Sequence, residues 1–128
     1  MKNGMKNTLL ILGLIIGLSA FKMSEDVEAL LKWETKAHDF GKIVKGEAAS
    51  HTFYFTNEGD QPIQIVKTKS SCGCTVSKHT KGEIKVGEQG FVKAEYNASK
   101  SGVFSKSVRV YTSLDENPIV LQVKGEVE

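Results

Sequence analysis

The chain lacks the features that would assign it at once to a large functional class. Its 17 Lys and Arg residues nearly balance 15 Asp and Glu residues, giving a net charge of +2 over 128 residues. Nucleic-acid-binding domains instead carry a strong basic patch or stripe, so we expect no nucleic-acid partner. The sequence has no Gly-x-Ser-x-Gly nucleophile elbow and no glycine-rich phosphate loop. We therefore expect a protein that is not an enzyme and binds no cofactor.

Long hydrophobic runs are also scarce. The one uncharged apolar run, TLLILGLIIGLSAF (8–21), has about 14 residues, whereas a membrane-spanning helix needs about 20. The run follows Lys2 and Lys6, and a basic start before a short apolar run is typical of a secretory signal peptide. The sequence therefore predicts export, with a signal peptide and linker in residues 1–29 and a folded domain in residues 30–128.

Two places in this N-terminal segment fit signal-peptide cleavage. One follows Ser19 or Ala20, and the other follows Ala29, where Val27 and Ala29 satisfy the rule of small residues before the cut. An uncleaved segment is the alternative, and it would tether the protein to the membrane by its N-terminus. Because no cysteine directly follows the apolar run, we exclude a bacterial lipoprotein anchor and expect a periplasmic or extracellular protein.

Apolar and polar residues alternate with a period of two along most of the remaining chain. In HTFYFTN (51–57), Phe53 and Phe55 share one face and Tyr54 lies on the other, which is the pattern of a half-buried strand. Turn-forming residues separate such runs, as in NEGDQP (57–62) and NASKSG (97–102). The pattern predicts strands at Leu31–Ala37 with a continuation to Ile43, and at 51–57, 63–70, 74–79, 90–96, 104–112 and 119–127.

About seven short strands, with turn signals every 8 to 12 residues or so, are typical of an immunoglobulin-like β-sandwich. A small β-barrel is the alternative arrangement. The likeness to immunoglobulins is architectural only, because Trp33 precedes both cysteines and the cysteines are too close in sequence to bridge two sheets. We expect the following residues in the core: Phe53, Phe55, Val108, Val110 and Leu121.

Several segments in a fixed order carry a family likeness. They are FGKI (40–43), FYFTNEG (53–59), PIQI (62–65), SCGCT (71–75), IKVGEQG (84–90), GVFSKSVRVYT (102–112) and LQVKGEV (121–127). Together they resemble the bacterial domain of unknown function 1573 over roughly residues 35–127. Val86 departs from the family, which often has proline there. The resemblance implies an immunoglobulin-like fold, related in shape to the sandwich repeats of ciliary and centrosomal proteins and to pilus chaperones, and it implies no established activity.

Both cysteines of the chain lie in one motif, Cys72-Gly73-Cys74. On an extended strand their side chains would share a face, with the two Cα atoms roughly 6.5 Å apart. A disulfide accepts Cα separations of about 4.4–6.8 Å, so a bridge is possible but strained unless the backbone bends at Gly73. Export would expose the pair to oxidising conditions, which makes Cys72 and Cys74 a possible disulfide or redox pair.

Four roles are open for the cysteine pair. It is structural, either as two small apolar side chains or as a local bridge at a bend, or it exchanges thiols and disulfides, although no nearby group clearly lowers a thiol pKa. As a third role, Cys72 and Cys74 bind Cu(I) or Zn with His79 as a weak third ligand, and His51 and His38 as weaker ones. As a fourth, the pair forms a mixed disulfide with a partner. Because the chain has no second cysteine pair, we expect no resident metal.

The missing catalytic residues favour a binding or structural module of the bacterial cell envelope. The edges of a sheet present unpaired N–H and C=O groups that accept a strand from another protein. We therefore expect one or more protein partners in the envelope, and the sequence predicts no particular oligomeric state. The alternative function is that of a thiol-redox or copper- or zinc-handling protein that uses Cys72 and Cys74.

Overall fold

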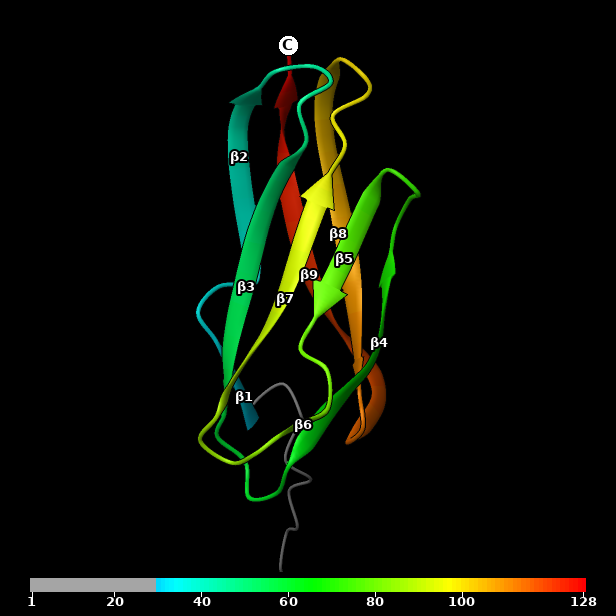
Figure 1. Ribbon diagram of the computed structural model, residues 1–128. Helices are drawn as coiled ribbons and strands as arrows, with labels where there is room; N and C mark the ends of the chain where they lie inside the picture. The colour runs from blue at the N-terminus through cyan, green and yellow to red at the C-terminus, as the bar shows by residue number, and fades with distance from the viewer. Residues whose placement is uncertain (1–29) are drawn as a thin grey trace, which may run out of the picture.

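The computed structural model describes residues 30–128, which fold into a sandwich of two β-sheets (Figure 1). Its strands are β1 (Leu31–Trp33), β2 (Ala37–Ile43), β3 (Ala49–Asn57), β4 (Ile63–Ser70), β5 (Thr75–His79), β6 (Glu83–Ile84), β7 (Gln89–Tyr96), β8 (Gly102–Thr112) and β9 (Asp115–Val127). The first sheet has the strand order β1-β3-β7-β5, and the second has the order β2-β9-β8-β4-β6. The predicted all-β, immunoglobulin-like sandwich is confirmed.

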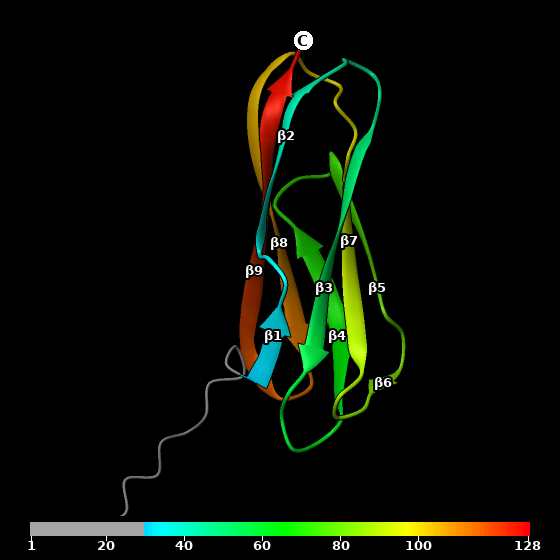
Figure 2. The ribbon, with the colours of Figure 1, turned by 90° about the vertical axis from the view of Figure 1, so that its left-hand side faces the viewer.

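The two sheets form separate layers, which are seen from the side in the view turned by 90° (Figure 2). In that view β2, β8 and β9 lie on one side, and β3, β5 and β7 lie on the other. Within residues 30–128, no helix has the length and apolarity needed to cross a membrane. The predicted signal peptide and both of its predicted cleavage places lie outside the described residues.

The prediction was wrong at the first strand, which we expected to run from Leu31 to Ala37 and on to Ile43. The chain instead forms β1 in the first sheet and β2 in the second. The N–H of Glu34 donates to the carbonyl of Tyr54 in β3, and the carbonyl of Lys36 accepts from Gln122 in β9. The chain therefore changes sheets within three residues. The inward-facing positions change from odd-numbered residues in β1 to even-numbered residues at the start of β2, and the three residues between them are polar.

The other differences are one additional short strand and shifted strand ends. Strand β6 was not predicted, and β9 begins at Asp115 rather than at residue 119, because Thr112 pairs directly with Asp115 across a two-residue hairpin loop. Most of the segment SLDENP (113–118), which lies between the predicted strands 104–112 and 119–127, therefore belongs to β9. Pro118 has no partner in β8 because it lies at a register irregularity, where the missing N–H of proline costs little.

Two hydrophobic clusters fill the space between the sheets. The five predicted core residues are all at most 1% exposed and lie in the larger cluster, so that prediction is confirmed. The smaller cluster consists of Tyr96, Ala98, Phe104 and Val127. Burying one large apolar side chain stabilises a fold by about 1.5–3 kcal/mol, so these clusters hold the two sheets together.

In each cluster a phenylalanine ring packs close to a cross-strand glycine. Phe55 pairs with Gly90 in the first sheet, and Phe104 pairs with Gly125 in the second. A Cβ atom added at Gly90 would lie 2.5 Å from Cζ of Phe55, and one added at Gly125 would lie 2.9 Å from Cζ of Phe104. Glycine is therefore needed at both positions to leave room for the ring.

Candidate functional site: the cysteine turn and the β5 edge

The Cys72-Gly73-Cys74 motif lies in the turn between β4 and β5, not on a strand as the separation estimate assumed. At this turn the chain crosses from the second sheet to the first (Figure 1). The structure joins Cys72 and Cys74 in a disulfide, with Cα atoms 5.3 Å apart. This separation is shorter than that of an extended strand because the chain turns at the motif.

Backbone hydrogen bonds attach the cysteine turn to both sheets. The N–H of Ser71 donates to the carbonyl of Ser107 in β8 at 2.9 Å, and the N–H of Asn97 donates to the carbonyl of Cys74 at 3.0 Å. Cys74 also packs against the smaller hydrophobic cluster, and both cysteines are half-buried. Because the two sulfur atoms are bonded to each other, neither is a free thiolate that could bind a metal in this state.

The three histidines named as metal ligands lie in two places. His79 ends β5, and its Nδ1 lies 2.9 Å from the carbonyl oxygen of Thr80. His38 of β2 and His51 of β3 stack on each other, with ring centroids 3.8 Å apart. In the part of the chain that the structure describes, no group of three or more His, Cys, Asp and Glu residues is arranged to hold a metal ion.

The stacked histidines form a contact between the two sheets. Phe40 and Phe53 meet them edge-on, with ring centroids 4.8 Å from His38 and 4.7 Å from His51. Burial lowers the pKa of His51 below its usual value of 6.5, and the neighbouring His38 lowers it further. A proton on His51 would place a positive charge in this contact, against the ring of Phe53, so the contact favours neutral His51 and makes it sensitive to acid.

Three of the four strands that end the sheets offer little to a partner strand. β1 has three residues and β6 has two. β2 carries a bulge, because its register with β9 shifts between Asp39 and Lys42, and Gly41 has a φ of +67° there. Short edges, bulges and charged edge side chains are devices that keep sheets from pairing with other chains.

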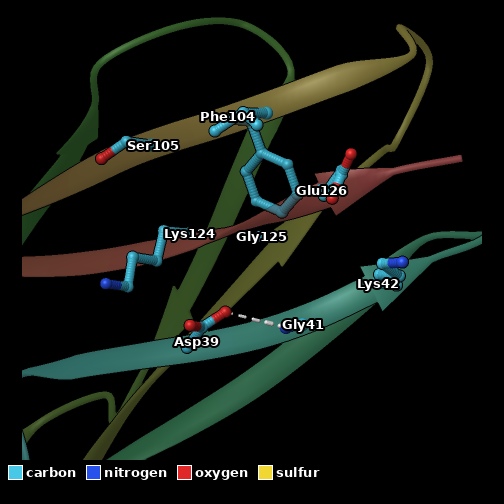
Figure 3. A pocket seen from close by; sticks show the side chains of 9 residues that line it. Asp39, Gly41, Lys42, Phe104, Ser105, Lys124, Gly125 and Glu126 are labelled. Atoms are coloured by element: carbon cyan, nitrogen blue, oxygen red, sulfur yellow. Dashed lines mark hydrogen bonds between the residues drawn. The ribbon is translucent and has the colours of Figure 1, made fainter.

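The bulge in β2 also leaves an open hollow beside it, with a volume of about 350 Å³ (Figure 3). Its charged lining is mixed, with Asp39 and Glu126 against Lys42 and Lys124. The N–H of Gly41 donates to Oδ1 of Asp39 at 2.8 Å, which shapes the bulge. Opposite charges in one open hollow select no particular ion, so this hollow follows from the bulge and assigns no chemistry.

The fourth edge strand, β5, is regular and has a neighbour on one side only. From Thr75 to His79 it pairs with β7 in an unbroken antiparallel register. Figure 1 shows it at the outer edge of its sheet, next to β7. Within the described strands, β5 is therefore the only sheet-ending strand longer than three residues that has no bulge.

Hydrogen bonds at the two ends of β5 show which backbone groups face outward. The carbonyl of Cys74 accepts from the residue that follows β7, and the N–H of Thr80 donates to β7, at 3.0 and 3.1 Å. Bonded and non-bonded pairs alternate along an antiparallel ladder, so the two even-numbered residues between them face β7 as well. The N–H and C=O groups of Ser77 and His79 therefore point to the open side.

Side chains on β5 both fix the strand and expose apolar surface. Oγ of Ser77 shares a hydrogen bond with Oγ1 of Thr68 in β4, which ties the edge to the second sheet. Val76 is 59% exposed on the outer face of the first sheet, next to the exposed Lys78. The turn, the ladder and this hydrogen bond thus hold β5 as a fixed template with one free side.

Comparison with known proteins places the chain in a family. A family model described as "Protein of unknown function (DUF1573)" matches residues 31–127. The chain belongs to this family. The resemblance drawn from the sequence segments is therefore confirmed. A comparison of this DUF1573 chain with curated proteins found no match.

Solved structures with the same fold come from distant proteins. A PapD-like (ASH) domain of human CEP192 superposes with a TM-score of 0.68 at 12% identity, over 88% of this chain and 95% of that domain. A protein of unknown function from Porphyromonas gingivalis W83 gives 0.65 at 14% identity, over 76% of this chain and 46% of its own. The VesB protease of Vibrio cholerae gives 0.61 at 13% identity, over 78% and 32%.

These likenesses show the fold alone. The chain spans less than half of the Porphyromonas protein and about a third of the protease. A shared sandwich does not carry function with it, because function depends on sites built on the fold. The cysteines and histidines could be identified as candidate site residues from the sequence. The open side of β5 could not, because the order of strands in the sheet decides which strand is an edge.

Proposed function

We propose that this DUF1573 chain is an exported, non-catalytic module of the bacterial cell envelope that binds an extended segment of a partner protein along β5. The observation that carries the proposal is the regular, open edge of β5, with outward-facing backbone groups at Ser77 and His79. Addition of a strand to an exposed edge is a recurring mode of peptide recognition. The basic start and short apolar run at the N-terminus support export.

The expected affinity is moderate. Ser77 and His79 offer two N–H and two C=O groups to an added strand, and each backbone hydrogen bond adds a net of about 0.5–1.5 kcal/mol. The backbone alone therefore supplies about 2–6 kcal/mol, from which the ordering of the partner segment must be subtracted. Selectivity has to come from side chains, and the exposed Val76 and Lys78 flank the outward-facing residues on the strand.

Photo-crosslinking with a matched pair of edge variants tests the proposal. A photoreactive amino acid is placed at Lys78 in cells of the source bacterium, with position 67 on the other sheet as the reference. In Ser77→Pro the outward N–H is lost and the ladder to β7 is kept. Ser77→Ala loses the hydrogen bond to Thr68 but keeps the N–H.

We expect one crosslinked partner from position 78 in the parent and in Ser77→Ala, and its loss in a folded Ser77→Pro variant. The same partner crosslinking from position 67, or a crosslink that Ser77→Pro leaves unchanged, would contradict binding along β5. Fractionation of the cells tests export separately, since the proposal places the protein outside the cytoplasm, with its N-terminus near the predicted cleavage places.

A second candidate function is thiol–disulfide exchange at Cys72 and Cys74. The observation in its favour is the two-residue separation of the bridged cysteines. In the chain-entropy model such a short loop stabilises the fold by only about 1.5 kcal/mol. A purely structural bridge would therefore add little stability at this position. A redox titration decides, because a bridge that is reduced only below about −300 mV is a structural one.

A further inference from the structure

A polar hollow of about 260 Å³ lies on the second sheet where the end of β4 meets β8. Its lining consists of Lys69, Ser70, Ser71, Ser107 and Arg109. Two cationic side chains and three hydroxyl groups thus surround one space, and no carboxylate lines it. All of these groups are potential hydrogen-bond donors to an anion.

The two cations of this hollow oppose each other in the sheet. Lys69 and Arg109 are direct cross-strand partners in β4 and β8, and like charges in that arrangement destabilise a sheet. Within residues 30–128 neither of them forms a salt bridge with a carboxylate. The repulsion is therefore left without compensation by the protein, and an anion bound between the two cations would relieve it.

Two of the serines lie on the same face as the cations. Ser107 is two positions from Arg109 on β8, and side chains at this spacing on a strand share a face. Ser71 directly follows the end of β4 and lines the same hollow. The N–H of Ser107 donates to Oγ of Ser71 at 3.1 Å, so the hydroxyl proton of Ser71 is left to donate elsewhere. With about 6.6 Å along a strand and about 4.8 Å between strands, these four groups enclose a space suited to a single oxyanion.

The charges around the hollow also favour an anion. Lys67 lies two positions before Lys69 in β4, and its Nζ is 4.8 Å from the centroid of the Tyr111 ring. The partner of Arg109 on the β9 side is Val120, and the partner of the next position on that face is Gln122. An anion in the hollow would therefore meet a third cation nearby and no carboxylate on the adjoining strand positions.

We propose that this hollow binds a tetrahedral oxyanion, namely the phosphate or sulfate group of a soluble molecule or of a lipid headgroup. The guanidinium of Arg109 presents a fork of parallel N–H donors, to which Lys69 adds an ammonium and Ser71 a hydroxyl. Three or four oxygen atoms on one centre use such a set of donors more completely than the two oxygen atoms of a carboxylate. The hollow lies on the second sheet, whereas β5 belongs to the first sheet. A test of the oxyanion site is therefore independent of a test of the proposed function.

Amide NMR shifts of the purified chain, titrated with sodium phosphate, sodium sulfate and sodium acetate at constant ionic strength, test this proposal. We expect saturable shifts at residues 69–71 and 107–109 with phosphate and sulfate. Arg109→Gln should weaken phosphate binding about tenfold or more, since it removes charge-assisted hydrogen bonds. Lys93→Gln in β7 is the control, because it removes one positive charge from the other sheet and should change the phosphate affinity less than twofold.

Shifts that rise linearly without saturation, equal binding of acetate and phosphate, or unchanged phosphate affinity in Arg109→Gln would overturn the proposal. The variant should stay folded, with a melting temperature in phosphate-free buffer at or above that of the parent, because it removes a repulsion. Lys69→Gln provides an independent second variant, for which we expect the same loss of phosphate binding.

Vesicles identify the source of the anion. Co-sedimentation with phosphatidylglycerol vesicles but not with phosphatidylcholine vesicles, abolished by Arg109→Gln, would assign a lipid headgroup. Saturable phosphate binding without vesicle binding would assign a soluble ligand. Both results support an oxyanion site.

Discussion

Replacing Gly90 by alanine tests how tightly the sandwich is packed around Phe55. The added Cβ would lie 2.5 Å from Cζ of Phe55 and 2.8 Å from Cδ1 of Ile84. Both of these side chains are 1% exposed. The ring of Trp33 also packs against Phe55, with centroids 4.6 Å apart, and this contact restricts how far the Phe55 ring can shift.

The expected cost follows from overpacking. Extra methyl groups in a well-packed core cost about 1–3 kcal/mol, and here two buried side chains must both shift. Alanine has less conformational entropy than glycine in the unfolded chain, and this difference stabilises the folded state of the variant by only about 0.4–1 kcal/mol. We therefore expect Gly90→Ala to lower the free energy of unfolding by about 2 kcal/mol, measured by urea denaturation as a lower midpoint with an unchanged slope.

A double-mutant cycle and a matched glycine variant complete this test. Phe55→Leu removes the ring atoms that the alanine would meet, so the two substitutions should cost less together than the sum of their separate costs, by about 1 kcal/mol. Gly73→Ala is the control, because its Cβ would meet nothing within 4 Å, and its effect should stay within about 0.5 kcal/mol. Equal effects of Gly90→Ala and Gly73→Ala, or additive costs in the cycle, would refute the reasoning.

Three further predictions concern the core, the histidines and the cysteines. Phe55→Ala should cost about 3–5 kcal/mol, and a soluble variant with an unchanged melting temperature would contradict its placement. The lowered pKa of His51 means that the unfolded chain binds more protons below pH 6.5. The contribution of His51 to the free energy of unfolding should therefore be fully present above pH 6.5 and be lost as the pH drops through its folded-state pKa. In acid denaturation curves, His51→Gln should flatten this dependence on pH, whereas the control His79→Gln should not. Intact mass should show two alkylated thiols, Cys72 and Cys74, only after reduction, whereas alkylation without reduction would contradict the bridge.

Much of the fold follows from sequence because side-chain alternation is a local property. The alternation around Phe53 and Phe55 places both residues in the core, and both are buried. The switch of sheets between Trp33 and Ala37 changes the inward-facing positions from odd-numbered to even-numbered residues, but the three residues in between are polar and do not show where the change occurs. Strand β6 has only two residues, and its existence depends on pairing with β4 rather than on any pattern of its own.

The candidate sites are less accessible from sequence. The Cys72-Gly73-Cys74 motif is visible at once, but its place in a crossing between sheets depends on which sheet each neighbouring strand joins. Lys69 and Arg109 lie 40 positions apart and become partners only through the register of β4 and β8. Periodicity predicts which face of a strand a residue occupies, whereas these sites are decided by strand order and register.

Residue-resolved amide hydrogen exchange tests the central claim, the open edge of β5, most directly. In the free protein we predict fast exchange at Ser77 and His79, whose N–H groups face the open side, and protection at Val76 and Lys78, which face β7. In the complex with the crosslinked partner segment, Ser77 and His79 should become protected. Protection of both amides in the free protein, or fast exchange that persists in the complex, would contradict strand addition at β5.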